Sequence, residues 1–181
     1  MKVLDVGCGN CKLKGAIGID KSPGADIRHD LNRFPYPVKS NSFDKIYSRH
    51  CLEHLDYFEE VIEEFYRIVK KDGIIEIIVP FYASPGANHP THKKFFNYHS
   101  FDILAESKHN RWSLDSKAEF RVIETKYHFH AKAVKTKYTL VSKIVLFLPE
   151  VFANAFPLFY QRFFGNILPA FELRFILKPI N

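Results

Sequence analysis

The sequence contains little of what marks secreted, membrane-spanning or repetitive proteins. Its three cysteines, Cys8, Cys11 and Cys51, are an odd number, and no signal peptide precedes the first apolar run, so we expect free thiols in a cytoplasmic protein. The apolar stretch near the C-terminus is interrupted and too short to cross a membrane. No repeat, low-complexity tract or linker divides the chain. These absences predict one domain spanning residues 1–181.

The composition is sufficient for a hydrophobic core and leaves the choice of partner open. With 181 residues, of which 46% are apolar, the chain is long enough to bury one sizeable core. The net charge of +6 would assist binding to nucleic acid, to an anionic membrane or to an acidic substrate. Charge alone does not choose among these partners.

The first 80 residues have the pattern of an α/β protein. Short apolar runs bounded by turn residues predict four strands, at 2–6, 16–20, 25–30 and 43–48. Apolar positions at helical spacing predict a helix over 55–71, and the β-branched run 73–80 is typical of a central parallel strand covered on both faces. A helix between two such strands makes a right-handed crossover.

The second half of the chain is less regular. We expect a long loop at 81–98, a short helix near 99–108, and strands at 120–132 and 171–178. An aromatic-rich segment of about 138–170 has helical spacing. It is interpreted first as a helix pair that covers the core. The alternatives are the wall of an apolar substrate pocket, a homodimer contact and an interfacial membrane segment.

The opening turn VLDVGCGNCKLKGAIGID follows the first predicted strand. Gly7 and Gly9 form a Gly-x-Gly that lets the backbone come close to a ligand. A dinucleotide fingerprint needs a third glycine five places after the first and an acid about twenty residues further on. Lys12 takes the glycine position, and Asp20 follows Gly7 by only 13 residues. The pattern therefore disfavours NAD.

The order of motifs resembles that of the class I S-adenosylmethionine-dependent methyltransferases, in a subfamily with a short first glycine loop. The resemblance covers roughly residues 1–102. Beyond the glycine loop it includes HDLNRFPYPVKSNSFDKIYSRHCLEHL, EEFYRIVKKDGIIEIIVP and HPTHKKFF, in that order. It implies a Rossmann-like fold, with a mostly parallel seven-stranded sheet flanked by helices and an antiparallel last strand. It also implies S-adenosylmethionine as cofactor and methyl transfer to an acceptor that the sequence does not identify.

The resemblance assigns cofactor roles to the glycine loop. Gly7 and Gly9 would lie beneath the methionine and ribose moieties, and Asp5 would orient the loop or the amino group. Asp20 would accept hydrogen bonds from both ribose hydroxyls. Cys11 stands where the family has a third glycine, and the following helix is expected to shrink to about one turn. So short a loop suits a mononucleoside better than a pyrophosphate.

Two further segments complete the cofactor site that the resemblance implies. Asp30 and Leu31 would meet the adenine amino group and one face of the ring. Ser48, Arg49 and His50, which follow the fourth predicted strand, would line the methionine end.

The histidines of the loop after residue 80 are the candidate catalytic groups. The loop follows a strand end, where α/β sheets bind ligands. His92 is the first candidate and His89 the second for a general base that takes a proton from the acceptor. Methyl transfer from a sulfonium is a direct displacement, so positioning supplies much of the acceleration and a base is optional. Alternatively, both histidines only hydrogen-bond the loop to the body.

A zinc site is the less favoured interpretation of the cysteines. Cys8 and Cys11 form a C-x-x-C that His50, Cys51 and His54 could approach. A small residue in a tight GCG turn explains Cys8 as well, and no metal is predicted.

The expected function is S-adenosylmethionine-dependent methyl transfer, and two alternatives come from other classes. One is a noncatalytic cofactor-binding or partner-binding module. The other is a basic RNA-binding protein that uses aromatics such as Tyr127 and Phe129 beside lysines at 132, 135, 137 and 143. For the enzyme, the aromatic segment suggests a small-molecule or lipid-linked or glycan-precursor acceptor.

Overall fold

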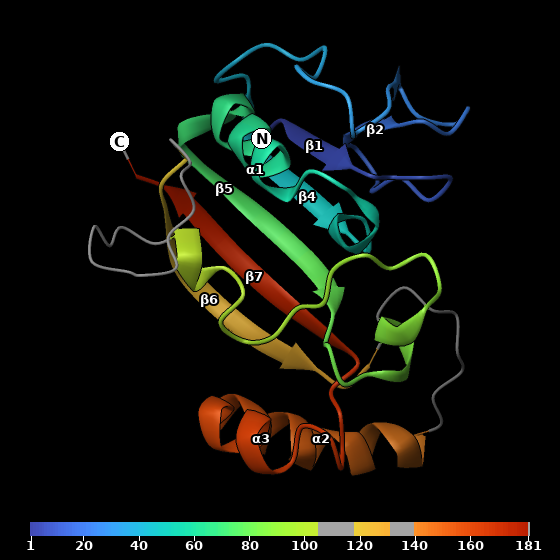
Figure 1. Ribbon diagram of the computed structural model, residues 1–181, viewed down its shortest axis with the longest axis vertical. Helices are drawn as coiled ribbons and strands as arrows, with labels where there is room; N and C mark the ends of the chain where they lie inside the picture. Colours follow the sequence, from blue (N-terminus) through green and yellow to red (C-terminus); the bar gives the residue numbers. More distant parts are fainter. Residues whose placement is uncertain (105–117, 131–139, 181) are drawn as a thin grey trace.

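The computed structural model describes residues 1–104, 118–130 and 140–180. Within these residues seven strands form one sheet, in the order β3-β2-β1-β4-β5-β7-β6 (Figure 1). The strands are β1 (Val3–Val6), β2 (Ile17–Asp20), β3 (Ile27–Arg28), β4 (Phe43–Arg49), β5 (Val69–Pro80), β6 (Phe120–His128) and β7 (Glu172–Pro179). The first five strands pair in parallel, and β7 runs antiparallel to both of its neighbours. This confirms the predicted Rossmann-like α/β fold.

The described helices are α1 (Phe58–Ile68), α2 (Leu140–Ala155) and α3 (Pro157–Phe163), with 3-10 helices η1 (Leu52–His54), η2 (Pro85–Asn88) and η3 (Asp102–Leu104). The helix predicted over 55–71 is shorter in the structure. Its last two carbonyls, which have no partner within the helix, accept the backbone N–H groups of Asn41 and Ser42, each at 2.9 Å. The chain then extends at once, so β5 begins at Val69 instead of at residue 73.

No helical turn forms between β1 and β2, which corrects the prediction for this loop. The Leu13 N–H binds the Asp5 carboxylate at 2.7 Å, so it is not available to a helical carbonyl. Cys11 N–H donates to Cys8 O at 3.0 Å and closes an isolated reverse turn that no helix continues. The predicted helix near 99–108 is present as η3, and residues 105–108 lie outside the described part of the chain.

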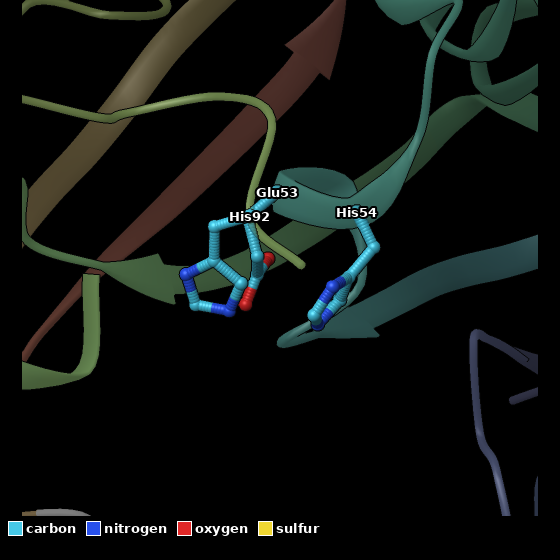
Figure 2. Close-up of side chains that lie close together, drawn as sticks. All are labelled: Glu53, His54 and His92. Atoms are coloured by element: carbon cyan, nitrogen blue, oxygen red, sulfur yellow. The ribbon is translucent and has the colours of Figure 1, made fainter. Parts of the chain in front are cut away.

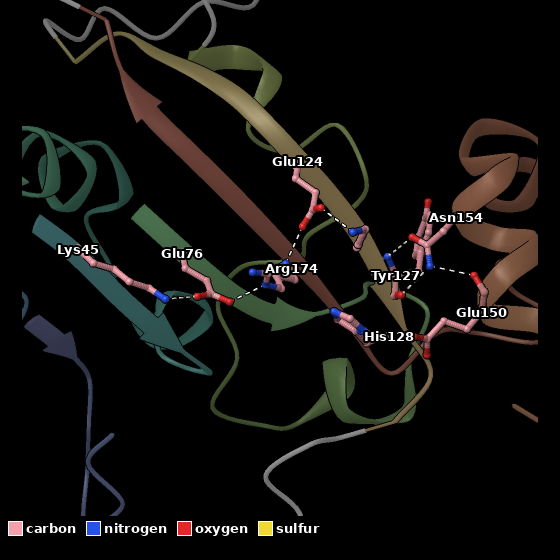
Figure 3. A network of polar contacts seen from close by, with 9 residues as sticks. Lys45, Glu76, Glu124, Tyr127, His128, Glu150, Asn154 and Arg174 are labelled. Atoms are coloured by element: carbon pink, nitrogen blue, oxygen red, sulfur yellow. Dashed lines mark hydrogen bonds and ion pairs between the residues drawn. The ribbon is translucent and has the colours of Figure 1, made fainter. Parts of the chain in front are cut away.

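The sheet core has the burial that was predicted for its central strand. Residues 75–81 are all buried, as expected for a strand covered on both faces. Charged side chains cross the sheet in a row from Lys45 through Glu76 and Arg174 to Glu124, and thereby join β4, β5, β7 and β6 (Figure 3). Burial acts to raise the pKa of Glu76, but the hydrogen bonds from Lys45 and Arg174 outweigh it and lower the pKa.

Helix α2 packs against the edge strand β6 through polar groups. Asn154 accepts a hydrogen bond from Tyr127 N and donates one to Tyr127 O, both at 2.9 Å (Figure 3). Glu150 accepts from Phe129 N at 2.9 Å and approaches His128 Nδ1 at 3.4 Å. The helix therefore closes the end of a strand edge that would otherwise be unpaired.

Few of the described side chains of the aromatic segment are buried. Ala153 and Tyr160 lie in the core, whereas most of its large apolar side chains are exposed. The exposed set, called the aromatic face below, comprises Val145, Phe147, Leu148, Val151, Phe152, Phe156, Leu158, Phe159, Phe163, Phe164, Ile167 and Leu168. Of the helices that the structure describes, none is long and apolar enough to cross a membrane.

The aromatics proposed for RNA stacking are not at the surface. Tyr127 and Phe129 are buried, with 0% and 5% of their surfaces exposed. Bases stack on exposed aromatic faces, so these two rings cannot form such a platform. Lysines 132, 135 and 137 lie outside the described residues.

Candidate functional site

The main cavity lies where the strand order of the sheet reverses. β1 pairs with β2 on one side and with β4 on the other, and in open α/β sheets ligands bind at the carboxyl ends of the strands at this point. A cavity of about 440 Å³ is found there. It is lined by Gly7, Asp20, Lys21, Asp30, Leu31, Asn32, His50, Cys51, His54, Leu55, Thr91 and Lys93.

A second cavity of about 390 Å³ shares Gly7 and His50 with the first. Its remaining lining residues are Asp5, Cys8, Cys11, Lys12, Leu13, Lys14, Tyr47 and Arg49. Seven of the nine residues predicted to hold the cofactor thus line one of two adjoining cavities. The two others, Gly9 and Ser48, line neither.

The two predicted glycines differ in their surroundings. Gly7 has φ +77°, and a Cβ placed on it would lie 2.3 Å from Cys51 Sγ. Gly9 has φ +51°, and a Cβ there would meet no atom within 4 Å. Both backbones are in the left-handed region that favours glycine. Only at Gly7 does close packing also demand it.

Asp5 and Asp20 fix the loop between them. Asp5 is buried and accepts from Leu13 N at 2.7 Å, and its burial raises the pKa of the carboxyl above the ordinary value. Asp20 accepts from Gly9 N at 3.1 Å, Ser22 N at 2.8 Å and Ser22 Oγ at 2.7 Å. Burial acts to raise the pKa of Asp20, but these hydrogen bonds lower it below the ordinary value. Asp20 is therefore an ionised acceptor at neutral pH.

Asp30 and Leu31 present a polar group beside an apolar one. Asp30 accepts from Asn32 N at 3.1 Å, and Leu31 is buried, with its carbonyl held by the Tyr36 hydroxyl at 2.9 Å. Both line the main cavity. A flat heteroaromatic ring with an exocyclic amine would find an acceptor and an apolar contact here.

The end of β4 carries a charge cluster that the sequence does not reveal. Ser48 is fully buried, and Arg49 Nη2 lies 3.4 Å from Glu172. His50 lies between Glu53 and Glu172, with Nδ1 3.3 Å and Nε2 3.0 Å from their carboxylates. Burial acts to lower the pKa of His50, but its bonds to Glu172 and Glu53 raise it to about 9. His50 is therefore an imidazolium at neutral pH.

The loop after β5 brings its histidines toward η1. The rings of His54 and His92 lie 4.6 Å apart between centroids, and those of His89 and His92 lie 5.4 Å apart. His99 stands apart and pairs with Asp102. Neither His89 nor His92 lines the main cavity, whereas His54 does. The two candidate bases thus lie beside the cavity wall.

The cysteine cluster considered for zinc has a packing explanation. Cys51 is buried against Gly7, and burial raises the pKa of its thiol well above the ordinary value. Burial likewise raises the pKa of Cys8 to about 11, and Cys11 is exposed. Among the described residues, the cysteines form no cluster with ligand atoms close enough to share an ion.

The comparisons with known proteins point to one family. Residues 1–129 match the family model described as a methyltransferase domain. No curated protein sequence matches the chain significantly.

Solved structures with the same fold include an S-adenosylmethionine-dependent methyltransferase of Archaeoglobus fulgidus, with 20% identity and a TM-score of 0.61 over 98% of this chain and 85% of that one. Another, from Thermotoga maritima, has 14% identity and a TM-score of 0.59 over 98% and 81%. The 4+2 cyclase SpnF has 15% identity and a TM-score of 0.57 over 99% and 75%. At these identities the likeness shows the shared fold.

The match of the family model and the strand order agree with each other and with the sequence motifs. The chain therefore belongs to the methyltransferase-domain family, the class I group that its sequence resembles, whose cofactor is S-adenosylmethionine.

Proposed function

We propose that this chain binds S-adenosylmethionine in the main cavity and transfers its methyl group to an acceptor. The observation that carries the proposal is that four side chains from separate segments line one cavity. Asp20 ends β2, Asp30 and Leu31 follow β3, and His50 follows β4. These residues come from three separate segments, which the parallel sheet brings together.

The hydrogen-bond acceptors and apolar side chains of the cavity fit a nucleoside. Asp20 already accepts three hydrogen bonds, and a carboxylate has about four acceptor positions. One position remains for a ribose hydroxyl, and the Ser22 hydroxyl would have to turn away before the second could bind. Leu31 and Leu55 offer apolar contact to a base.

Bound S-adenosylmethionine supplies an activated methyl group on a positively charged sulfur, and the protein has to position the acceptor. Methyl displacement gains most from such positioning. His92 donates from Nδ1 to Ala87 O at 3.0 Å, so in its neutral form the lone pair is on Nε2. We assign His92 as the general base for an acceptor with a proton to lose. His89 comes second, because its Nδ1 accepts from Thr91 N at 3.4 Å.

The aromatic face favours an apolar acceptor, such as a lipid-linked or glycan precursor, over a small polar one.

The two alternative functions, a noncatalytic module and an RNA-binding protein, differ from methyl transfer in what they predict. The shared fold of the cyclase SpnF illustrates that the architecture also serves chemistry other than methyl transfer. RNA binding would require affinity that falls steeply with salt, and the burial of Tyr127 and Phe129 removes its stacking surface.

The test is a calorimetric titration with S-adenosylmethionine and S-adenosylhomocysteine. Asp20→Ala should weaken binding at least about tenfold, because a hydrogen bond to a charged group contributes roughly 1.5–3 kcal/mol. Asp44→Ala is the matched control, since Asp44 pairs with Lys70 at the opposite end of β4. Equal affinity in the Asp20→Ala variant and the wild-type protein would overturn the cofactor assignment. Binding without methylation of any acceptor fraction would favour the noncatalytic module.

A further inference from the structure

We propose that Glu53, His54 and His92 form a binding site for a divalent transition-metal ion of the zinc type at the edge of the main cavity. One ligand atom from each residue lies within 4.8 Å of the others (Figure 2). In Figure 2 the Glu53 carboxylate and the His54 ring extend from η1, and the His92 ring faces them from the loop after β5. This site goes beyond the proposed function, because ion binding does not require the cofactor.

The two segments that carry the ligands are tied together by hydrogen bonds. Lys93 N–H donates to Glu53 O at 2.7 Å, and Lys94 N–H approaches the same oxygen at 3.3 Å. His54 Nδ1 lies 3.3 Å from Thr91 O and 3.1 Å from Thr91 Oγ1. The loop is thus fastened to η1 on both sides of His92, so the cluster exists before any ion arrives.

Hydrogen bonds also set the tautomers of both histidines. Ala87 O accepts from His92 Nδ1 at 3.0 Å, and Thr91 O accepts from His54 Nδ1. A carbonyl oxygen only accepts, so each Nδ1 carries the proton and each Nε2 keeps its lone pair. Metal-binding histidines are oriented in the same way, with the nitrogen that does not bind the metal donating to a carbonyl or carboxylate.

Glu53 supplies the independent observation that points to a cation. Its side chain is 1% exposed, and Oε1 bonds His50 while Oε2 has no hydrogen-bond partner. A buried carboxylate oxygen without a partner is costly, and a bound cation removes that cost. A cation bound by the Glu53 carboxylate and the two imidazole nitrogens would therefore supply the missing partner.

The donor set selects the class of ion. Two imidazole nitrogens and one carboxylate suit Zn²⁺ or Co²⁺, whereas Mg²⁺ and Ca²⁺ prefer oxygen ligands throughout. Three protein ligands leave one tetrahedral position open, as in catalytic zinc sites. His54 also lines the main cavity, which puts the ion next to the cofactor site. While His92 binds the ion, its Nε2 lone pair cannot act as the general base.

The test is a Co²⁺ and Zn²⁺ titration of chelator-treated protein without S-adenosylmethionine. We expect one equivalent of Co²⁺ per chain with a tetrahedral visible absorption. Glu53→Gln and His92→Ala should each weaken Zn²⁺ binding at least about tenfold. His99→Ala is the control, because His99 is an exposed histidine of the same region that pairs with Asp102.

Two results would overturn the metal site. One is the absence of saturable binding below about 100 µM. The other is equal Zn²⁺ affinity in the Glu53→Gln, His92→Ala and His99→Ala variants. Circular dichroism monitors folding of each variant. If the buried Glu53→Gln variant unfolds, His92→Ala still tests the site, because it alters only a partly exposed loop side chain. The cofactor proposal is tested independently, by titrating wild-type and Asp20→Ala protein with S-adenosylmethionine in the presence of chelator. Failure of the metal site therefore does not imply failure of the cofactor site, or the reverse.

Discussion

At the scale of single residues, the glycine loop combines two different constraints. Gly7 is needed for its backbone conformation and for its contact with Cys51, whereas Gly9 is needed for its backbone alone. The contact at Gly7 joins the end of β1 to the start of η1, and so it links the cofactor loop to the segment that carries His54. A change at Gly7 should therefore affect both parts of the site.

Replacing each glycine by alanine should separate these constraints. Gly9→Ala should cost about 1 kcal/mol of unfolding free energy, the usual cost of a left-handed backbone for alanine. Gly7→Ala adds an overlap with Cys51 and should cost about 1–3 kcal/mol more. Urea denaturation of both variants measures the difference. Equal losses would show that Cys51 moves away without cost.

Neighbours in space were predictable where one sequence motif contains them, and contacts between distant segments were not. Asp5 lies within β1, Gly7 follows it and Asp20 ends β2, so the pairing of these two consecutive strands brings the three residues together. Glu172 lies 122 residues from His50 in the sequence. Glu172 reaches His50 because β7 pairs with β5. An acidic residue at the start of a strand is an ordinary sequence feature, so nothing in the sequence marks Glu172 as a partner of His50.

At the scale of elements, α2 takes the place of a further strand beside β6. Asn154 makes with Tyr127 both hydrogen bonds that a neighbouring strand would make. The sequence predicted the helix but not this contact, because the aromatic spacing suggested that phenylalanines would pack on the sheet. The polar residues Asn154 and Glu150 fix the helix instead, and most phenylalanines are left outside.

Asn154→Ala should destabilise the domain by about 1–3 kcal/mol, because it leaves the N–H and the carbonyl of the buried Tyr127 without partners. Val151→Ala is the control on the same helix, since Val151 is 50% exposed and its truncation should cost less than about 0.5 kcal/mol. Urea denaturation gives both values. An unchanged stability in Asn154→Ala would mean that α2 is not held by this contact.

Glu150 should make the attachment of α2 depend on pH. Burial acts to raise its pKa, but the bonds from His128 and Phe129 N lower it to about 2, below the ordinary value of 4.5. A lowered folded pKa means that the stabilisation is present above about pH 4.5 and is lost as the pH falls toward 2. The difference in unfolding free energy between wild type and Glu150→Gln should therefore narrow between pH 5 and pH 3. Glu59→Gln, at an exposed position of α1, should show no such narrowing.

At the scale of the whole molecule, the main cavity and the aromatic face belong to different regions. The cavity lies at the carboxyl ends of β1 and β4, and α2 and α3 lie together beyond the end of β6, at the bottom of Figure 1. None of the residues that define the aromatic face lines the main cavity. Short local patterns predicted the individual strands, and the family resemblance implied the mostly parallel sheet, but apolar periodicity does not distinguish a helix face that covers the core from one left exposed.

An exposed apolar face of this size on a chain of net charge +6 should adsorb to anionic phospholipid vesicles, as a protein with a lipid-linked acceptor would. Replacing Phe156, Phe159 and Phe163 by serine should abolish co-sedimentation with vesicles and leave the thermal midpoint nearly unchanged, because these side chains are 59%, 50% and 54% exposed. These substitutions are preferable to deleting residues 143–170, because the deletion would also remove Asn154 and Glu150, whose hydrogen bonds attach α2 to β6 and the residue after it.

Ile123→Ser is the control for that triple variant, because it removes an equally exposed apolar side chain from β6. It should leave vesicle binding intact if the aromatic face is responsible. Wild-type protein that ignores vesicles but forms dimers in sedimentation equilibrium, with the triple variant monomeric, would assign the face to a homodimer contact instead. Apolar association of either kind should persist in high salt, whereas adsorption driven by the basic charge alone should be lost as screening increases.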